Sequence, residues 1–137
     1  PLRAMIAQGK TTQDLTFFTA AMLAYQPEGP LEDVTAFAKM VHEAASPEFE
    51  LKIRDIINSH SSIDLLGRIT CPVLILHSRH DAVHPLSEAH KLASGLSDAE
   101  LVVLECRNHV PMRGNPAFDV YLQELCRFMA EPDSPNH

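Results

Sequence analysis

The sequence predicts an α/β protein in which a helical region precedes two parallel strands and their flanking helices. Two short apolar runs, at 72–77 and 101–105, have the length and composition of buried strands. The segment between them, 86–95, is long enough for one helix, which Pro85 can begin and Gly95 can end. Because a strand, a helix and a second strand form a crossover unit, we expect the two strands to be parallel and adjacent.

Each strand run is followed by a residue that can take part in acid–base chemistry. Asp81 lies in the turn after the first run, and His109 follows the second run directly after Arg107 and Asn108. The carboxyl ends of parallel strands meet at one edge of the sheet, where open α/β sheets place their sites. We therefore expect Asp81 and His109 to lie side by side. The alternative is that Asp81 caps a turn, while Arg107 and Asn108 only orient a loop.

The order of these features resembles the last third of an α/β-hydrolase. The resemblance rests on three features in this order. They are the first strand, then Asp81 before Val83-His84-Pro85, and then the second strand, which ends in Asn108-His109. The closest similarity is to hydrolase-like modules associated with bacterial LuxR-type transcriptional regulators and nucleotide cyclases. It implies the C-terminal part of the α/β-hydrolase fold, with Asp81 as the acid and His109 as the base of a catalytic triad.

The nucleophile of that family is absent from the sequence. It lies in a Gly-x-Ser-x-Gly turn between a strand and a helix, and the chain contains no such run. The most similar segment surrounds Ser97. It follows a helix and precedes a strand, whereas the family's motif follows a strand and precedes a helix. We therefore expect a fragment that is inactive alone, with its nucleophile upstream in a longer parent. If the chain does carry a nucleophile, the first candidates are Ser97, Ser78 and Cys106.

The region 1–60 is expected to be helical, and the resemblance implies that it is a lid over the active site. Apolar spacing predicts helices at about 12–25, 31–45 and 47–57, the last capped by Ser46. The alternative is an ordinary helical bundle whose aromatic residues form its core. Sequence alone leaves open which aromatic residues would be core and which would line a pocket: Phe17, Phe18, Tyr25 and Phe37.

The region 61–130 is expected to be the C-terminal part of the hydrolase core, and 131–137 a disordered tail. Ser62 is expected to cap a short helix that leads into the first strand. Asn115 and Pro116 have the residue types that begin a helix, so a final helix is expected after them.

Composition excludes several classes of function. The formal net charge of -7, from 11 basic and 18 acidic residues, opposes a nucleic-acid surface. The start of the sequence lacks a signal-peptide pattern and no apolar run approaches a membrane span, so we expect a cytoplasmic protein. Three cysteines in no paired spacing indicate a reducing compartment, and all three are expected in the core: Cys71, Cys106 and Cys126.

A metal or another cofactor is not expected. Four histidines cluster near Asp81 in sequence, but Pro85 interrupts a regular helical spacing between them, and no Cys or carboxylate spacing completes a ligand set. The four are His77, His80, His84 and His90.

Two functions of different classes remain open. The first is a serine hydrolase of esters, amides or similar small substrates. The second is a non-catalytic module that senses a small ligand for a transcriptional regulator. Both predict a small-molecule partner, and both predict a homo-oligomer or association with the missing N-terminal part, because two parallel strands cannot cover their own edges.

Overall fold

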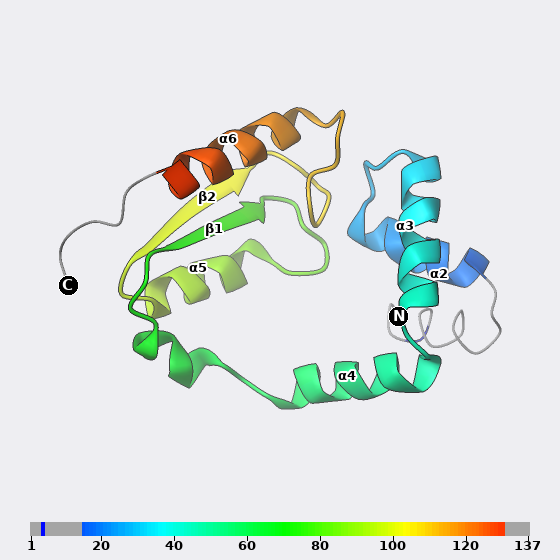
Figure 1. Cartoon of the computed structure of the whole chain (residues 1–137), viewed down its shortest axis with the longest axis horizontal. Coiled ribbons are helices and arrows are strands. Elements are labelled where there is room, and N and C mark those ends of the chain that lie inside the picture. Colours follow the sequence, from blue (N-terminus) through cyan, green and yellow to red (C-terminus); the bar gives the residue numbers. More distant parts are fainter. Residues whose placement is uncertain (1–3, 5–14, 131–137) are drawn as a thin grey trace. The chain divides into compact units, whose positions relative to one another are not determined.

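The computed structural model describes residue 4 and residues 15–130 of the chain (Figure 1). The chain divides into two compact units, Pro1–Asp64 and Leu65–His137. The expected tail at 131–137 and the first residues of the helix expected from position 12 lie outside the described residues. None of the described helices is long and apolar enough to cross a membrane.

In the first unit, two helices pack together as a hairpin. They are α2, Leu15–Tyr25, and α3, Leu31–Ala44, as the apolar spacing predicted. Their buried residues recur at intervals of three and four, so each helix turns one stripe toward the other. The buried residues are Phe18, Ala21 and Met22 of α2 and Val34 and Ala38 of α3. Phe18 is fully buried, so it is a core residue of this hairpin and not a pocket wall.

A further helix of this unit is α4, Pro47–Ser59. Ser46 caps it as predicted, since its hydroxyl accepts the N–H of Phe49 at 3.2 Å. Of the apolar residues that predicted the helix, those whose side chains the structure describes are exposed: Ile53, Ile56 and Ile57. The sequence pattern therefore predicted the helix correctly but did not show which surface, if any, would cover its apolar side.

As far as the chain is described, the second unit contains two strands and two helices, and a 3₁₀ helix crosses its start. Their bounds are η1 Ile63–Arg68, β1 Val73–Ser78, α5 Leu86–Gly95, β2 Ala99–Leu104 and α6 Pro116–Ala130. The strands pair in parallel from Val73 opposite Ala99 to Ser78 opposite Leu104, which confirms the predicted pairing. The hydroxyl of Ser61 accepts the N–H of Ile63, the first residue of η1, at 3.4 Å, and the cap expected from Ser62 stays a prediction.

The strand bounds differ slightly from those expected. The first strand begins at Val73 because Pro72 has no N–H for the ladder. The second begins at Ala99, earlier than expected, because the Val73 N–H donates to the Asp98 carbonyl at 3.0 Å and extends the pairing backwards.

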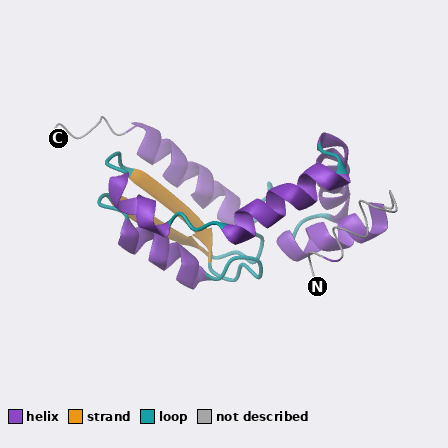
Figure 2. Ribbon diagram, turned by 90° about the horizontal axis from the view of Figure 1, so that it is seen from below, coloured by secondary structure: helices purple, strands orange, loops and turns teal. Residues whose placement is uncertain are grey.

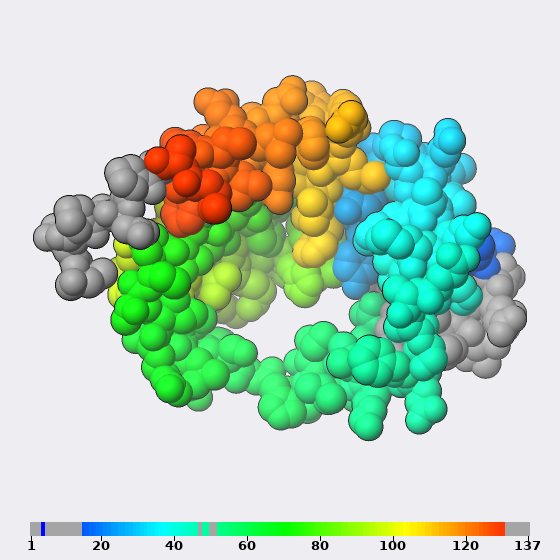
Figure 3. All heavy atoms as spheres, viewed as in Figure 1, coloured from blue at the N-terminus to red at the C-terminus, as the bar shows by residue number. Residues whose placement is uncertain are grey.

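The sheet lies between α5 and α6 (Figure 2). On the α6 face, Leu104, Cys106 and Ala117 form a buried cluster. Leu76, Val102 and Tyr121 pack around that cluster. Figure 3 shows the side chains of α6, in orange and red, against the green and yellow atoms of this unit. Helices on both faces are what a parallel sheet requires.

Two of the three cysteines do not lie in the core as expected. Cys106 is buried, whereas Cys71 and Cys126 are exposed. Cys71 precedes Pro72 and so lies outside the paired part of the strand. Cys126 is exposed because α6 turns Ala117 and Tyr121 toward the sheet, and position 126 falls away from that stripe.

Candidate active site

The loops that follow β1 and β2 are tied together by backbone hydrogen bonds. The Arg79 N–H donates to the Leu104 carbonyl at 2.9 Å, and the His80 N–H donates to the Cys106 carbonyl at 3.1 Å. The side chains of Arg79 and Glu105 also form an ion pair. These contacts continue the pairing past the ends of the strands, so the two loops leave the sheet side by side.

Asp81 and His109 meet at this edge of the sheet. The His109 Nδ1 lies 2.7 Å from the Asp81 Oδ2, which confirms that the two side chains come together as predicted. The Asp81 side chain is 2% exposed, whereas that of His109 is 36% exposed. The acid is therefore shielded from water, while the imidazole can be reached from the surface.

Three groups hold the Asp81 carboxylate in its ionised form. Its Oδ1 accepts the N–H of Val83 at 2.7 Å and the N–H of His84 at 3.3 Å, which makes an Asx-type turn. Burial raises the pKa of Asp81, but the hydrogen bond from His109, those two N–H groups and the charge on His109 outweigh it. Together they hold the pKa below its ordinary value.

The ionised carboxylate also determines the tautomer of His109. A carboxylate without its proton can only accept a hydrogen bond, so the Nδ1 of His109 must carry the hydrogen. In the neutral ring the lone pair then lies on Nε2. This is the tautomer in which a histidine serves as a general base.

A second imidazole, that of His84, lies beside His109, and the sequence analysis did not predict this contact. The ring of His84 is 5.2 Å from the ring of His109 between centroids, with the planes tilted by 45°. His84 itself is exposed. The contact arises because the turn at Asp81 folds the chain back, so the spacing Asp81-x-x-His84 was the signal that could have indicated it.

The three candidate nucleophiles do not present a reactive atom at this edge. Ser97 precedes β2, at the opposite end of the strand from His109, and its hydroxyl donates to the Ile69 carbonyl at 3.0 Å. Ser78 follows the sheet to the correct edge but is 1% exposed, and Cys106 is 2% exposed within the core cluster. Burial makes both hydroxyl and thiol inaccessible to a substrate.

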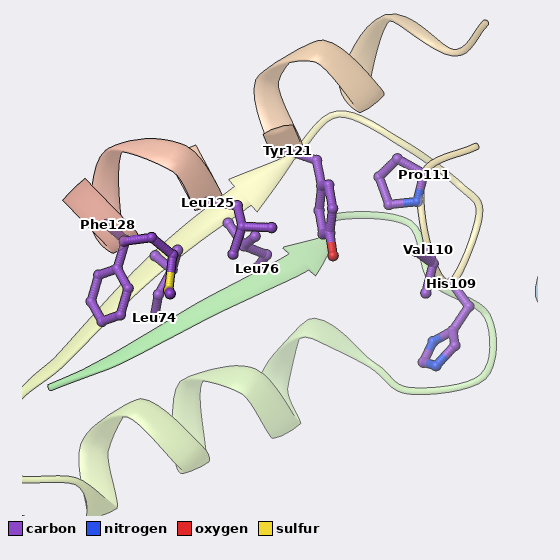
Figure 4. Close-up of a pocket in the computed structure, with 9 residues that line it drawn as sticks. Leu74, Leu76, His109, Val110, Pro111, Tyr121, Leu125 and Phe128 are labelled. Atoms are coloured by element: carbon purple, nitrogen blue, oxygen red, sulfur yellow. The ribbon is translucent and has the colours of Figure 1, made fainter. Parts of the chain in front are cut away.

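An apolar hollow of about 400 Å³ adjoins His109 (Figure 4). It runs between β1 and α6, and all of its wall belongs to the second unit. The wall consists of Leu74 and Leu76 of β1, the loop residues His109, Val110 and Pro111, and Tyr121, Leu125, Phe128 and Met129 of α6. An apolar part of a small molecule would be sheltered there next to the imidazole.

The other histidines near Asp81 do not assemble a ligand set. Within residues 15–130 and at residue 4, no group of three His, Cys, Asp or Glu side chains is placed to hold a metal ion. His77 instead directs its Nδ1 to the Ser78 carbonyl at 2.9 Å.

No model of a known protein family matches this sequence, and no curated protein matches it either. The α/β-hydrolase resemblance therefore stays a prediction. The chemistry of the site has to be inferred from the geometry of Asp81, His84 and His109.

Proposed function

We propose that Asp81 and His109 are the acid and the base of a hydrolase that acts on an ester, an amide or a similar small substrate. The observation that carries the proposal is the 2.7 Å contact between a buried carboxylate and a partly exposed imidazole. The Nε2 of His109 would take the proton of a nucleophile and later give it to the leaving group. Asp81 would hold the ring in place and stabilise the imidazolium.

The proposal includes the wider fold. Two parallel strands, with the acid after the first and the base after the second, support the C-terminal part of an α/β-hydrolase. The helices α2, α3 and α4 would then belong to a lid. The nucleophile and the oxyanion hole would come from a segment outside these 137 residues.

A p-nitrophenyl ester assay on this chain tests the first consequence. We expect turnover no faster than that of the His109→Ala variant, because a base without a nucleophile and an oxyanion hole gives little acceleration. Loss of a single oxyanion donor already costs about 10²- to 10³-fold in rate. Turnover that disappears in His109→Ala would mean that the chain has its own nucleophile, and variants of Ser97, Ser78 and Cys106 would identify it.

The full-length gene product tests the proposal itself. There we expect His109→Ala and Asp81→Asn each to lower kcat by about 10⁴- to 10⁶-fold, as loss of a triad member does. His90→Ala is the matched control, since His90 is an exposed histidine on α5. An active gene product that keeps its kcat after His109→Ala would refute the proposal.

A ligand-sensing module is the second candidate, and the apolar hollow favours it. The hollow adjoins His109 but consists almost entirely of aliphatic and aromatic side chains, which suit binding better than chemistry. A sensor would bind its ligand without converting it, and its gene would encode a DNA-binding region in the same reading frame.

A further inference from the structure

We propose that His84 and His109 together bind one divalent transition-metal ion of the zinc class, supported by Asp81. The proposal does not depend on hydrolase activity, because it concerns only these three side chains. Its first observation is the distance of 5.2 Å between the two ring centroids.

That distance is compatible with two imidazoles on a single ion. With zinc–nitrogen bonds of about 2.0–2.1 Å and tetrahedral angles, the centroids of two coordinated rings lie about 5 Å apart. His109 would coordinate through Nε2, because its Nδ1 is engaged with Asp81. Both rings can be reached from the surface, since His84 is exposed and the His109 side chain is 36% exposed.

The second observation is the buried carboxylate behind the rings. A histidine that binds a metal usually donates its other ring N–H to a carboxylate, which orients the ring and raises its basicity. The Asp81 Oδ2 occupies this position relative to His109. The Asp81 Oδ1 also accepts the backbone N–H of His84 at 3.3 Å, so the same carboxylate holds the backbone from which the second ring extends.

The chemistry of the ligands selects the ion. Imidazole nitrogen suits zinc, copper and nickel, whereas magnesium and calcium prefer oxygen ligands. No third ligand from the described part of the chain joins the two rings, so water would complete the coordination shell. Binding would therefore be weaker than at zinc sites with three or four protein ligands.

Metal binding would compete with acid–base chemistry at His109. Both uses require the lone pair on Nε2, so a bound ion would prevent the histidine from accepting a proton. A chain that carries the ion would hold its base in an inactive state.

Isothermal titration calorimetry of this chain with ZnCl₂, at neutral pH in a non-chelating buffer, tests the proposal. We expect one site whose affinity falls by at least about tenfold in His84→Ala, because a ligand is lost. Asp81→Asn keeps both ligands, and we expect it to lose about 10- to 100-fold in affinity, as loss of such a carboxylate does. His90→Ala should bind as the unaltered chain does, and MgCl₂ should show no binding.

Far-ultraviolet circular dichroism of each variant separates loss of the site from loss of the fold. His84→Gln provides a second substitution at the same exposed position. Zinc affinity unchanged in folded His84→Ala and His84→Gln would overturn the proposal. Equal affinity in Asp81→Asn would overturn the supporting role of the carboxylate.

Discussion

A single side chain, Asp81, accepts three hydrogen bonds at the edge of the sheet. It accepts from the imidazole of His109 and from the backbone N–H groups of Val83 and His84. In Asp81→Asn one oxygen becomes an NH₂ group, so the site loses either an acceptor for the loop or the acceptor for His109. Hydrogen bonds to a charged group each contribute about 1.5–3 kcal/mol, and we expect the free energy of unfolding to fall by roughly that amount.

Urea unfolding and the ¹⁵N chemical shifts of His109 measure the two effects. In the unaltered chain the shifts should show hydrogen on Nδ1, and in Asp81→Asn this preference should be lost. Asp98→Asn is the matched control, because Asp98 is an exposed aspartate in the loop before β2. An Asp81→Asn variant with the stability and tautomer of the control would show that the carboxylate does not organise the site.

The depressed pKa of Asp81 predicts how stability depends on pH. Because the pKa of Asp81 is lower in the folded than in the unfolded chain, the unfolded state takes up its proton first as the pH falls. The contribution is therefore complete above the unfolded pKa of about 3.9 and is lost as the pH falls toward the folded value. Thermal midpoints of the unaltered chain and of Asp81→Asn should thus differ most near pH 6 and converge below about pH 4. A difference that widens in acid would contradict this assignment.

The order of residues in the sequence was enough to predict some residues of the site but not others. Asp81 and His109 could be found because each lies in the turn after an apolar strand run, and parallel strands bring such positions to one edge. His84 could not, because its ring reaches His109 only after the turn at Asp81 has closed. The exposure of Cys126 depends on which side of α6 faces the sheet, and tertiary packing decides this.

At the level of elements, α5 ends in close contact with the 3₁₀ helix η1. A Cβ added to Gly95 would lie 2.6 Å from the Cδ1 and 3.2 Å from the Cβ of Leu66, which is buried. Gly67 offers a comparison in the same unit, because a Cβ there would meet nothing within 4 Å. The glycine at position 95 thus permits an approach that any side chain would obstruct.

Gly95→Ala should therefore destabilise the chain, although alanine is the better helix former. Overpacking typically lowers the free energy of unfolding by about 1–3 kcal/mol. Replacing glycine by alanine within a helix raises it by at most about 1 kcal/mol. Gly67→Ala should leave the thermal midpoint unchanged or slightly raised. If Gly95→Ala were as stable as Gly67→Ala, Leu66 would have to move aside without cost.

The elements also show why helices were easier to predict than their partners. Local sequence features predicted α4: Ser46 as its cap and an apolar residue at each turn. What covers Ile53, Ile56 and Ile57 depends on surfaces far away in the sequence, and these side chains are exposed in the described structure. The strands were found with small errors at their ends for a similar reason, since the pairing partner decides where a strand begins.

For the molecule as a whole, the sheet presents an open edge along β1. Within the described residues β1 pairs only with β2, so the sheet has two strands. The N–H groups of Val73 and Arg79 point toward the β2 side. By alternation, the backbone groups of Leu74 and Leu76 point to the open edge. Unpaired edges of this kind are templates for another strand, and two-stranded sheets are marginal alone.

We therefore predict that the chain forms a homodimer or a larger assembly through this edge. Leu74→Pro removes an outward-pointing N–H while leaving the donors to β2 in place, so it should shift the chain toward the monomer. Leu74→Ala is the matched control, because it removes the same side chain from the wall of the hollow but keeps the N–H. Sedimentation velocity at micromolar concentration measures both, with circular dichroism to confirm that each variant folds. A compact monomer for the unaltered chain would contradict the prediction, and equal dissociation of both variants would place the contact in the side chains of the hollow instead of the strand edge.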